Sequence, residues 1–480
     1  MSVFWGLFKT EIGLVLLCLG VLVYDIFLKD DPAHGRRMAG FAMAGVAILF
    51  AVLVLNAGQW GTSFGRSYVQ DGLAVVFKGI FLVAGFFTLF MVRSFQERLS
   101  RGHEEFTLLV LLSLTGMVVV ASANDFLLLF IALETVSIPL YILTAFQRER
   151  SASVEAGLKY VILGALSTAF FLFGLSFIYG AAGSTSYGAI QHLLAADASL
   201  HPAFGFGMLF IIAALGFKIA AFPFQMWVPD IYEGAPSPVT AFLAIGSKAA
   251  GFAALVRLLT GVFFPVGAEL AALFAVLAAL TMLYGNLGAI PQTNIKRLLG
   301  YSSIGHAGYI LMGLAAFSRT GHEAVLYYLM TYLFSTGGAF LVVIAVSRHF
   351  KTEEIQEYAG LARRSPALAA GMLVALVSLA GVPPLAGFFG KFYLIGAAVG
   401  SGLLWLALIG LLNVIPSLYF YLKIVNVMYV DPPKDGSVWT LAWPERAMQL
   451  FSVAGILVLG IWQGPFVRLA EWAFAQPFLR

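Results

Sequence analysis

Four charged side chains lie at the centre of apolar segments or beside breaks in them, where charge is costly. Glu134 is central in LLLFIALETVSIPLYIL, Lys248 is central in the segment 238–260, and Lys218 and Lys391 each lie close to prolines. A charge at the middle of a membrane helix costs about 2.5–3.5 kcal/mol on insertion scales. One glutamate–lysine pair could be purely structural, but three lysines against one glutamate indicate function.

Lysines in such a setting are suited to proton transfer. Loss of water disfavours the charged form of a lysine, and a carboxylate that comes closer favours it again. A lysine whose carboxylate partner moves therefore takes up and releases a proton. Metal cations prefer ligands without positive charge, which argues against a simple cation channel. The row of lysines predicts a proton relay.

Prolines next to two of these lysines predict broken helices. Pro223 follows Lys218 by five residues, and Pro383 and Pro384 precede Lys391 by seven or eight. A proline leaves backbone carbonyls without partners, and such breaks are tolerated at membrane depth where they line a hydrated cavity. Two broken helices with charges at similar depth, on oppositely directed helices, indicate an inverted repeat with sites near the membrane midplane.

The composition supports a membrane setting for these residues. The 480 residues are 60% hydrophobic and only 11% charged, whereas a soluble domain has about 25% charged residues. Apolar runs of about 20 residues recur along the chain, and each can cross a bilayer as a helix. The runs are continuously apolar rather than alternating, so we expect helices and not a barrel.

We expect an all-α polytopic membrane protein with 14 transmembrane helices, of which the seventh and the twelfth are broken. Long segments without a span, at 57–71, 182–203 and 429–446, are expected to be surface loops. The expected spans are 10–28, 37–56, 72–92, 105–122, 124–146, 152–181, 204–226, 238–260, 266–286, 302–318, 322–347, 366–400, 403–428 and 447–463.

Loop charges predict the orientation, because lysine and arginine collect in cytoplasmic loops. With the N-terminus outside the cytoplasm, the cytoplasmic loops hold sixteen of these residues and the opposite face holds five. Both termini are therefore predicted on the outer side.

Several chemistries have no support in the sequence. The single Cys18 excludes an internal disulfide and a four-cysteine iron–sulfur site. No segment has the glycine pattern of a nucleotide-binding loop. The seven histidines are scattered, and none forms a metal-ligand spacing with another on one helix, so no metal site is predicted. Any redox chemistry is expected on another subunit.

Other polar residues in the spans carry weaker signals. His306, Tyr301 and Lys159 are candidates for a secondary relay, although His306 could be a core histidine and Lys159 could simply pair with Glu155 four residues earlier. Three further basic residues lie near helix ends, where snorkelling to the headgroups is the expectation; they are Lys78, Arg257 and Lys423.

Four long motifs resemble one family. They are GFKIAAFPFQMWVPDIYEGAPSPVTAFLAIGSKAAGFAALVR, NDFLLLFIALETVSIPLYIL, NIKRLLGYSSIGHAGYILMG and GVPPLAGFFGKFYL. Together they are similar to the antiporter-like membrane subunits of proton-pumping NADH:quinone oxidoreductase, respiratory complex I. The resemblance covers nearly the whole chain and is greatest to the smallest of the three paralogues, subunit N. Lysine in the broken twelfth helix agrees with this choice, because subunit M typically has glutamate there.

The resemblance implies roles for the four central residues. Glu134 would pair with Lys218, Lys248 would connect the cytoplasmic input, and Lys391 would pass protons outward. It also implies an organisation of helices 1–3 in 1–104, two inverted five-helix repeats in 105–260 and 266–428, and a last helix and tail in 447–480.

The resemblance further implies the surroundings of the chain. Subunit M would flank one side and subunits K and J the other, in the inner membrane of a bacterium, and no nucleic acid is expected as a partner. This chain would hold no cofactor, while FMN, iron–sulfur clusters and quinone would belong to partner subunits. Two alternatives share most of the motifs: a subunit of a sodium/proton antiporter complex, and a subunit of a membrane-bound hydrogenase or ferredoxin-linked relative.

Overall fold

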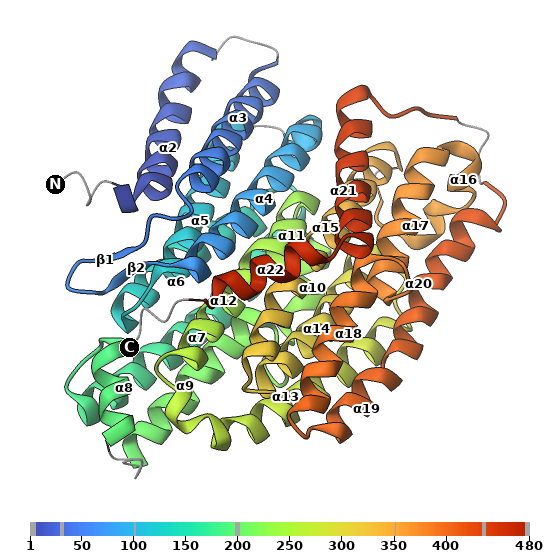
Figure 1. Cartoon of the computed structure of the whole chain (residues 1–480). Helices are drawn as coiled ribbons and strands as arrows, with labels where there is room; N and C mark the ends of the chain where they lie inside the picture. Colours follow the sequence, from blue (N-terminus) through green and yellow to red (C-terminus); the bar gives the residue numbers. More distant parts are fainter. Residues whose placement is uncertain are drawn as a thin grey trace. The chain divides into compact units, whose positions relative to one another are not determined.

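The computed structural model describes residues 6–28, 33–99, 102–196, 202–350, 352–433 and 438–475. Within these ranges the chain is helical apart from one short hairpin (Figure 1), which confirms the expected all-helical membrane fold. Some residues behind the orientation argument lie outside the described ranges: Lys29, Arg101, Lys351, Lys434 and Arg480.

The helices form two compact units. The first unit comprises Met1–Trp227, Gly234–Ala272 and Glu471–Arg480, and the second comprises Val228–Glu233 and Leu273–Ala470. The finer division into two inverted repeats stays a prediction.

The first unit begins with an antiparallel pair of long helices and a hairpin (Figure 1). Its helices are α2 (Lys9–Leu28), α3 (His34–Leu55), α4 (Gly72–Phe95), α5 (His103–Ser122), α6 (Phe126–Thr144), α7 (Ser151–Ala182), α8 (Tyr187–Ala196), α9 (Pro202–Ile219), α11 (Ser237–Phe242) and α12 (Lys248–Thr260). The hairpin pairs β1 (Gly61–Ser63) with β2 (Tyr68–Gln70). Short 3-10 turns follow α4 at η1 (Gln96–Arg98) and α12 at η3 (Phe264–Val266).

The second unit is built from the helices after α12. They are α13 (Gly267–Ala289), whose first residues belong to the first unit, α14 (Ile295–Ala315), α15 (Arg319–Phe350), α16 (Leu361–Arg364), α17 (Pro366–Ala380), α18 (Ala386–Gly400), α19 (Leu404–Leu412), α20 (Val414–Tyr429) and α21 (Trp443–Ile461). A 3-10 turn, η4 (Ile355–Tyr358), precedes α16. Two further helices span the division between the units, α10 (Trp227–Gly234) and α22 (Gly464–Ala473).

Twelve helices of the described residues are long and apolar enough to cross a membrane. The expected span 302–318 is helix α14, and the interrupted span 366–400 consists of the shorter helices α17 and α18. The total of 14 stays a prediction. Two expected loops contain elements of their own, because the hairpin lies within 57–71 and α8 lies within 182–203.

Both predicted helix breaks are confirmed. Helix α9 ends at Ile219, directly after Lys218, and Ala220 has a φ of +62°. Helix α17 ends at Ala380, and Gly381 follows with a φ of +89°, a conformation that suits glycine at a helix C-terminus. The peptide bonds before Pro223 and Pro384 are both cis.

A third irregularity lies immediately before Lys248. Residues Leu243–Ser247 form a π-helical turn, η2, between α11 and α12. Such wider turns inside helices are rare and often occur at functional sites.

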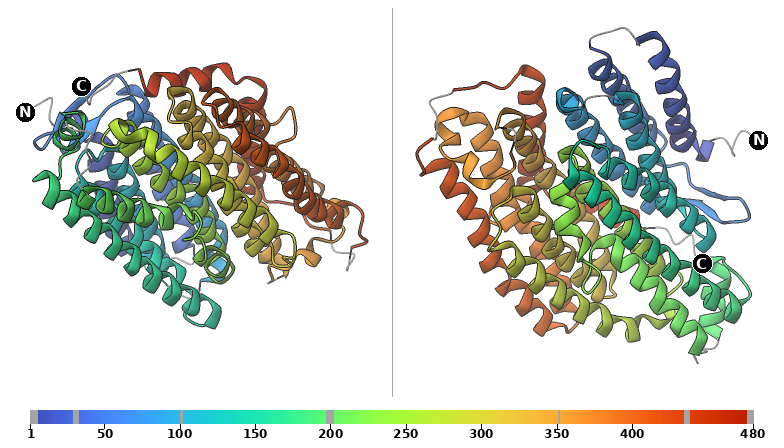
Figure 2. Two further views of the ribbon diagram at one scale, coloured as in Figure 1. Left: turned by 90° about the horizontal axis from the view of Figure 1, so that it is seen from below. Right: turned by 180° about the vertical axis from the view of Figure 1, so that it is seen from behind.

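Helices α7 and α9 lie side by side along the first unit (Figures 1 and 2). Their backbones touch because glycines face each other. A Cβ atom on Gly174 would lie 2.7 Å from the carbonyl oxygen of Gly207, and a Cβ on Gly207 would lie 2.7 Å from that of Gly174. Small residues that allow this approach are typical of helix pairs in membranes. The contact places the helix of Lys218 against α7.

Candidate functional site

The buried amine of Lys218 is held by the neighbouring helix α6. Lys218 is 7% exposed, and its Nζ donates a hydrogen bond of 2.5 Å to Ser137 Oγ. Ser137 lies three residues after Glu134, on the same face of α6, because residues three apart are neighbours on a helix. Lys218 therefore donates its hydrogen bond to a neutral hydroxyl and not to a carboxylate.

Glu134 is held by α7 at the other side of a small cavity. Thr168 Oγ1 donates a 2.8 Å hydrogen bond to Glu134 Oε1. The cavity has a volume of about 10 Å³, close to the space that one water molecule requires. Its lining includes Glu134, Thr168, Ser167 and Lys218.

Glu134 and Lys218 thus line one cavity. Among the described residues they form no direct ion pair; each is hydrogen-bonded to a different hydroxyl. The structure brings the two predicted residues together, and the direct pairing implied by the resemblance stays a prediction.

Aromatic rings form one wall around Lys218. Its Nζ lies 5.9 Å from the ring centroids of both Tyr141 and Phe217, within the range of cation–π attraction. Tyr160 packs edge-on against Tyr141 at 4.7 Å and stacks on Trp227 at 5.1 Å. These rings limit the positions open to the amine.

Lys248 is 2% exposed and is the first residue of α12, directly after the π-turn. One turn later, Gly251 lets α12 approach α9 closely. A Cβ on Gly251 would lie 2.7 Å from Ile219 Cγ2 and 3.3 Å from Lys218 Cβ. Two of the predicted relay lysines are therefore carried by helices in direct contact.

In the second unit, Lys391 binds the end of the broken helix. Lys391 is 4% exposed, and its Nζ donates a 2.8 Å hydrogen bond to the carbonyl oxygen of Ala380. Ala380 is the last residue of α17, where carbonyl groups lack helical partners and a positive charge is favourable. The amine also lies 4.8 Å from the ring centroid of Tyr309.

Gly381 makes room for this arrangement. A Cβ at Gly381 would lie 2.9 Å from Lys391 Cδ and 3.4 Å from its Nζ. A larger residue there would require the lysine side chain to shift.

His306, 5% exposed, lies in a buried chain of hydroxyl groups. Its Nδ1 is 2.6 Å from Tyr328 Oη and its Nε2 is 3.1 Å from Tyr421 Oη. Tyr421 is also hydrogen-bonded to Ser302. Tyr328 packs where a Cβ of Gly390, the neighbour of Lys391, would lie.

The comparisons with known proteins cover nearly the whole chain. A family model described as NADH:quinone oxidoreductase/Mrp antiporter, TM, matches residues 123–416. NADH-quinone oxidoreductase subunit N of Desulforamulus reducens is 41% identical over 476 residues, which is 99% of each chain. The chain belongs to the subunit N family. The deciding observation is this identity across both chains, because the family model alone also describes antiporters.

Solved structures agree with this family. A chain of respiratory complex I from Thermus thermophilus with bound aureothin is 34% identical, with a TM-score of 0.81 over 96% of this chain and 98% of that one. A chain of the Mrp complex from Dietzia has a TM-score of 0.84 at 20% identity, with 96% of both chains covered. The second likeness is one of fold.

The remaining sequence candidates lie apart from these contacts. Lys159 pairs with Glu155 at 2.9 Å on α7, where Glu155 is largely exposed and Lys159 is partly exposed. Tyr301 is partly exposed and packs near Tyr284, with ring centroids 6.1 Å apart. Their roles as secondary relays stay predictions.

Sequence reasoning missed the hydroxyl partners. Ser137 accepts from Lys218, Thr168 donates to Glu134, and Tyr328 and Tyr421 are hydrogen-bonded to His306. Only Ser137 had a usable signal, its spacing of three residues from Glu134. The others lie on different helices from the residues that they bind.

Snorkelling is the wrong interpretation for Lys78. Its side chain is 0% exposed and its Nζ lies 2.6 Å from Glu11 Oε1, 2.5 Å from Gln70 Oε1 and 2.9 Å from Tyr68 Oη. Burial, with the charge of Glu11, raises the pKa of Tyr68 well above its usual range. The phenol therefore keeps its proton and donates to Glu11 at 2.7 Å.

Arg257 is likewise buried, at 3% exposure. It donates two hydrogen bonds to Asp71, of 3.0 and 2.9 Å, and two to the carbonyl of Ala121. Asp71 also accepts from the backbone N–H of Ala74 at the start of α4. Lys423 is only partly buried and donates to the carbonyl of Gln292 at 3.4 Å.

Proposed function

We propose that the chain translocates protons as a non-redox membrane-arm subunit of a bacterial NADH:quinone oxidoreductase. The observation that carries the proposal is Lys218, a buried lysine at a helix break whose acceptor is a neutral serine, with Glu134 across a water-sized cavity. Family membership supports the assignment to this enzyme rather than to a stand-alone carrier.

The geometry suggests how the site works. While Lys218 is bound to Ser137 and Glu134 is bound to Thr168, the two charges are separated. Movement of the carboxylate toward the amine favours the protonated lysine, and movement away favours release. Protons then pass from Lys248 by way of Lys218 toward Lys391 and the outer side.

The driving force comes from partner subunits in this proposal. Quinone reduction, with FMN and iron–sulfur clusters, takes place there and displaces charges along the membrane arm. Subunit M is the proposed neighbour on one side, with subunits K and J on the other. The proposed location is the bacterial inner membrane, with both termini periplasmic.

The test is the Lys218→Ala variant in the assembled complex. Proton pumping into inverted membrane vesicles should fall at least about tenfold, because positioned proton-transfer groups typically contribute about 100-fold or more. Coupled quinone reductase activity should fall with it, while the subunit stays in the complex.

The matched control is Lys423→Ala, which removes a partly buried lysine bound only to a backbone carbonyl; pumping should stay near the wild-type rate. Near-normal pumping by an assembled Lys218→Ala complex contradicts the proposal.

A second candidate is sodium/proton antiport in a multi-subunit antiporter, since the matching family model also describes Mrp antiporters. Co-purification separates the two. Flavin and iron–sulfur subunits retained with the chain favour the oxidoreductase, whereas sodium-dependent antiport by the chain without redox partners favours the antiporter.

A further inference from the structure

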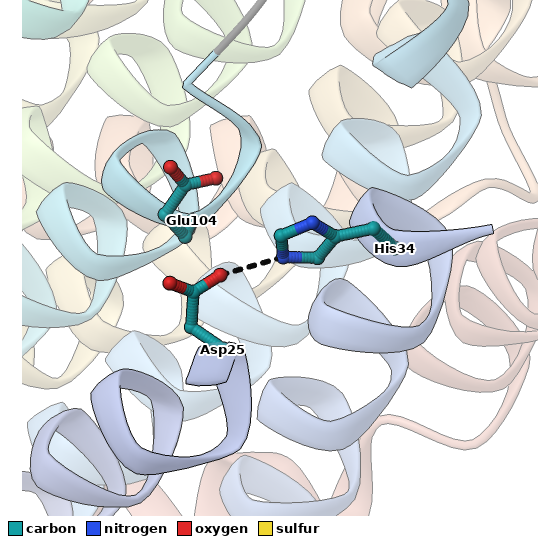
Figure 3. Close-up of side chains that lie close together, drawn as sticks. All are labelled: Asp25, His34 and Glu104. Atoms are coloured by element: carbon teal, nitrogen blue, oxygen red, sulfur yellow. Dashed lines mark ion pairs between the residues drawn. The ribbon is translucent and has the colours of Figure 1, made fainter. Parts of the chain in front are cut away.

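Three potential metal ligands meet at the ends of three helices in the first unit (Figure 3). Asp25 lies in the last turn of α2, His34 begins α3, and Glu104 is the second residue of α5. Asp25 Oδ1 lies 2.7 Å from His34 Nε2. One ligand atom from each of the three residues lies within 4.8 Å of the others.

A second observation points to a ligand at the same place. Gln96 is 5% exposed, yet neither polar atom of its side chain has a hydrogen-bond partner among the described residues, and the same holds for His103 Nδ1. Both side chains pack on Gly35, next to His34: a Cβ there would lie 2.2 Å from Gln96 Oε1 and 2.9 Å from His103 Cγ. Buried polar groups are nearly always satisfied, so such a group calls for a specific explanation.

We propose that Asp25, His34 and Glu104 bind a divalent transition metal ion, with zinc as the best fit. One imidazole nitrogen and two carboxylate oxygens are typical zinc ligands, and a three-residue zinc site keeps its fourth position for water. Calcium and magnesium favour oxygen ligands in larger number, and the set has no thiolate for copper(I).

The ligand atoms lie close to the spacing that this ion requires. Zinc bonds of about 2.0–2.2 Å in a tetrahedron hold the ligand atoms roughly 3.3 Å apart; here Asp25 Oδ1 and His34 Nε2 are 2.7 Å apart, and all three atoms lie within 4.8 Å of one another. Binding replaces the ion pair between His34 and Asp25, and charged or titratable groups close to His34 include His103 and Glu105.

The bound ion ties α2 and α3 to the start of α5. The site is separate from the relay residues and does not depend on the proposed function. Spacing along the chain does not reveal it, because each ligand belongs to a different helix.

Metal binding to the whole purified complex tests the proposal. The complex is freed of loosely bound metal with a chelator and dialysed against buffered free zinc in the micromolar range, and zinc per complex is measured by mass spectrometry. Wild type should hold one more zinc ion per chain than His34→Ala. The difference between the X-ray absorption spectra of wild type and variant reports on this additional zinc ion. It should show only nitrogen and oxygen neighbours, at about 2.0–2.2 Å.

The matched control is His192→Ala, which removes an exposed histidine on α8 and should leave the zinc content at the wild-type value. Glu104→Gln provides a second loss-of-ligand variant that keeps the side-chain volume, in case His34→Ala fails to assemble. Equal zinc in wild type and in the assembled ligand variants overturns the proposal, as does binding that needs millimolar zinc.

Discussion

Buried cations in the first unit are held in two different ways. Lys78 and Arg257 each contact a carboxylate directly, from Glu11 and Asp71. Lys218 is also buried, but a serine accepts its hydrogen bond and Glu134 lies across a cavity. Burial alone therefore does not separate the proposed relay lysine from the other two cations. The difference is that the acceptor of Lys218 is a neutral hydroxyl instead of a carboxylate.

The two arrangements respond differently to the loss of a partner. Removal of one member of a buried ion pair leaves an uncompensated charge and typically costs about 3–5 kcal/mol. Removal of a hydroxyl near a cavity leaves space for water, so we expect the fold to be retained and only proton transfer to change. This contrast leads to three predictions, taken from the largest expected effect to the smallest.

The largest effect is expected at the ion pair of Arg257. Asp71→Ala should lower the free energy of unfolding by about 3–5 kcal/mol, because it leaves the guanidinium buried without a carboxylate and also removes the hydrogen bond to Ala74. Retention of the chain in the purified complex and its thermal unfolding measure this loss.

The control for this change is the double variant Asp71→Ala with Arg257→Met. It replaces the pair by apolar groups, which is often nearly neutral, and should recover most of the stability. A stable single variant would mean that this pair is not what anchors α4 to α12.

A smaller effect, on function rather than on folding, is expected at Ser137. Ser137→Ala removes the hydrogen-bond acceptor of Lys218. Hydrogen bonds to charged groups contribute about 1.5–3 kcal/mol each to stability. Proton pumping should fall several-fold while assembly is normal. Ser113→Ala is the matched control, since that hydroxyl is also buried against α6 but bonds only the carbonyl of Val136. Equal pumping by the two variants would remove the distinction between Lys218 and the ion-paired Lys78 and Arg257.

The smallest effect is expected at Thr168. Thr168→Val keeps the shape of the side chain but removes the hydrogen bond to Glu134. Because Glu134 is only partly buried, we expect this hydrogen bond to contribute about 0.5–1.5 kcal/mol. The pumping rate should change modestly, and less than in Ser137→Ala. Thr135→Val, which loses an exposed hydroxyl one residue from Glu134, gives the baseline. A larger loss in Thr168→Val than in Ser137→Ala would reverse the order of importance.

The sequence was sufficient for features that depend on neighbouring residues. Apolar runs, the prolines beside Lys218 and Lys391, and the central position of Glu134 are all local, and the breaks occur where they predict. Family motifs added the assignment that the comparisons support.

Contacts between helices could not be predicted in the same way. In helices that are apolar on every side, periodicity does not tell which face meets which neighbour. Glu11 and Lys78 are 67 residues apart, so their pairing depends on how α2, α4 and the hairpin come together in space. The threonine bound to Glu134 was hidden for the same reason.

Glycine contacts join two pairs of helices around Glu134 and Lys218. A Cβ on Gly116 of α5 would lie 2.6 Å from the backbone nitrogen of Val136, so α5 and α6 touch through their backbones, as α7 and α9 do at Gly174 and Gly207. No side chain separates the two backbones at either contact.

In the proposed mechanism, the distance between Glu134 and Lys218 changes when α6 is displaced relative to α9. Glu134 and Ser137 are three residues apart on α6, or about 4.5 Å along the helix axis. A displacement of that length would exchange the serine for the carboxylate beside the amine, so the same movement of α6 would also change the charge next to Lys218.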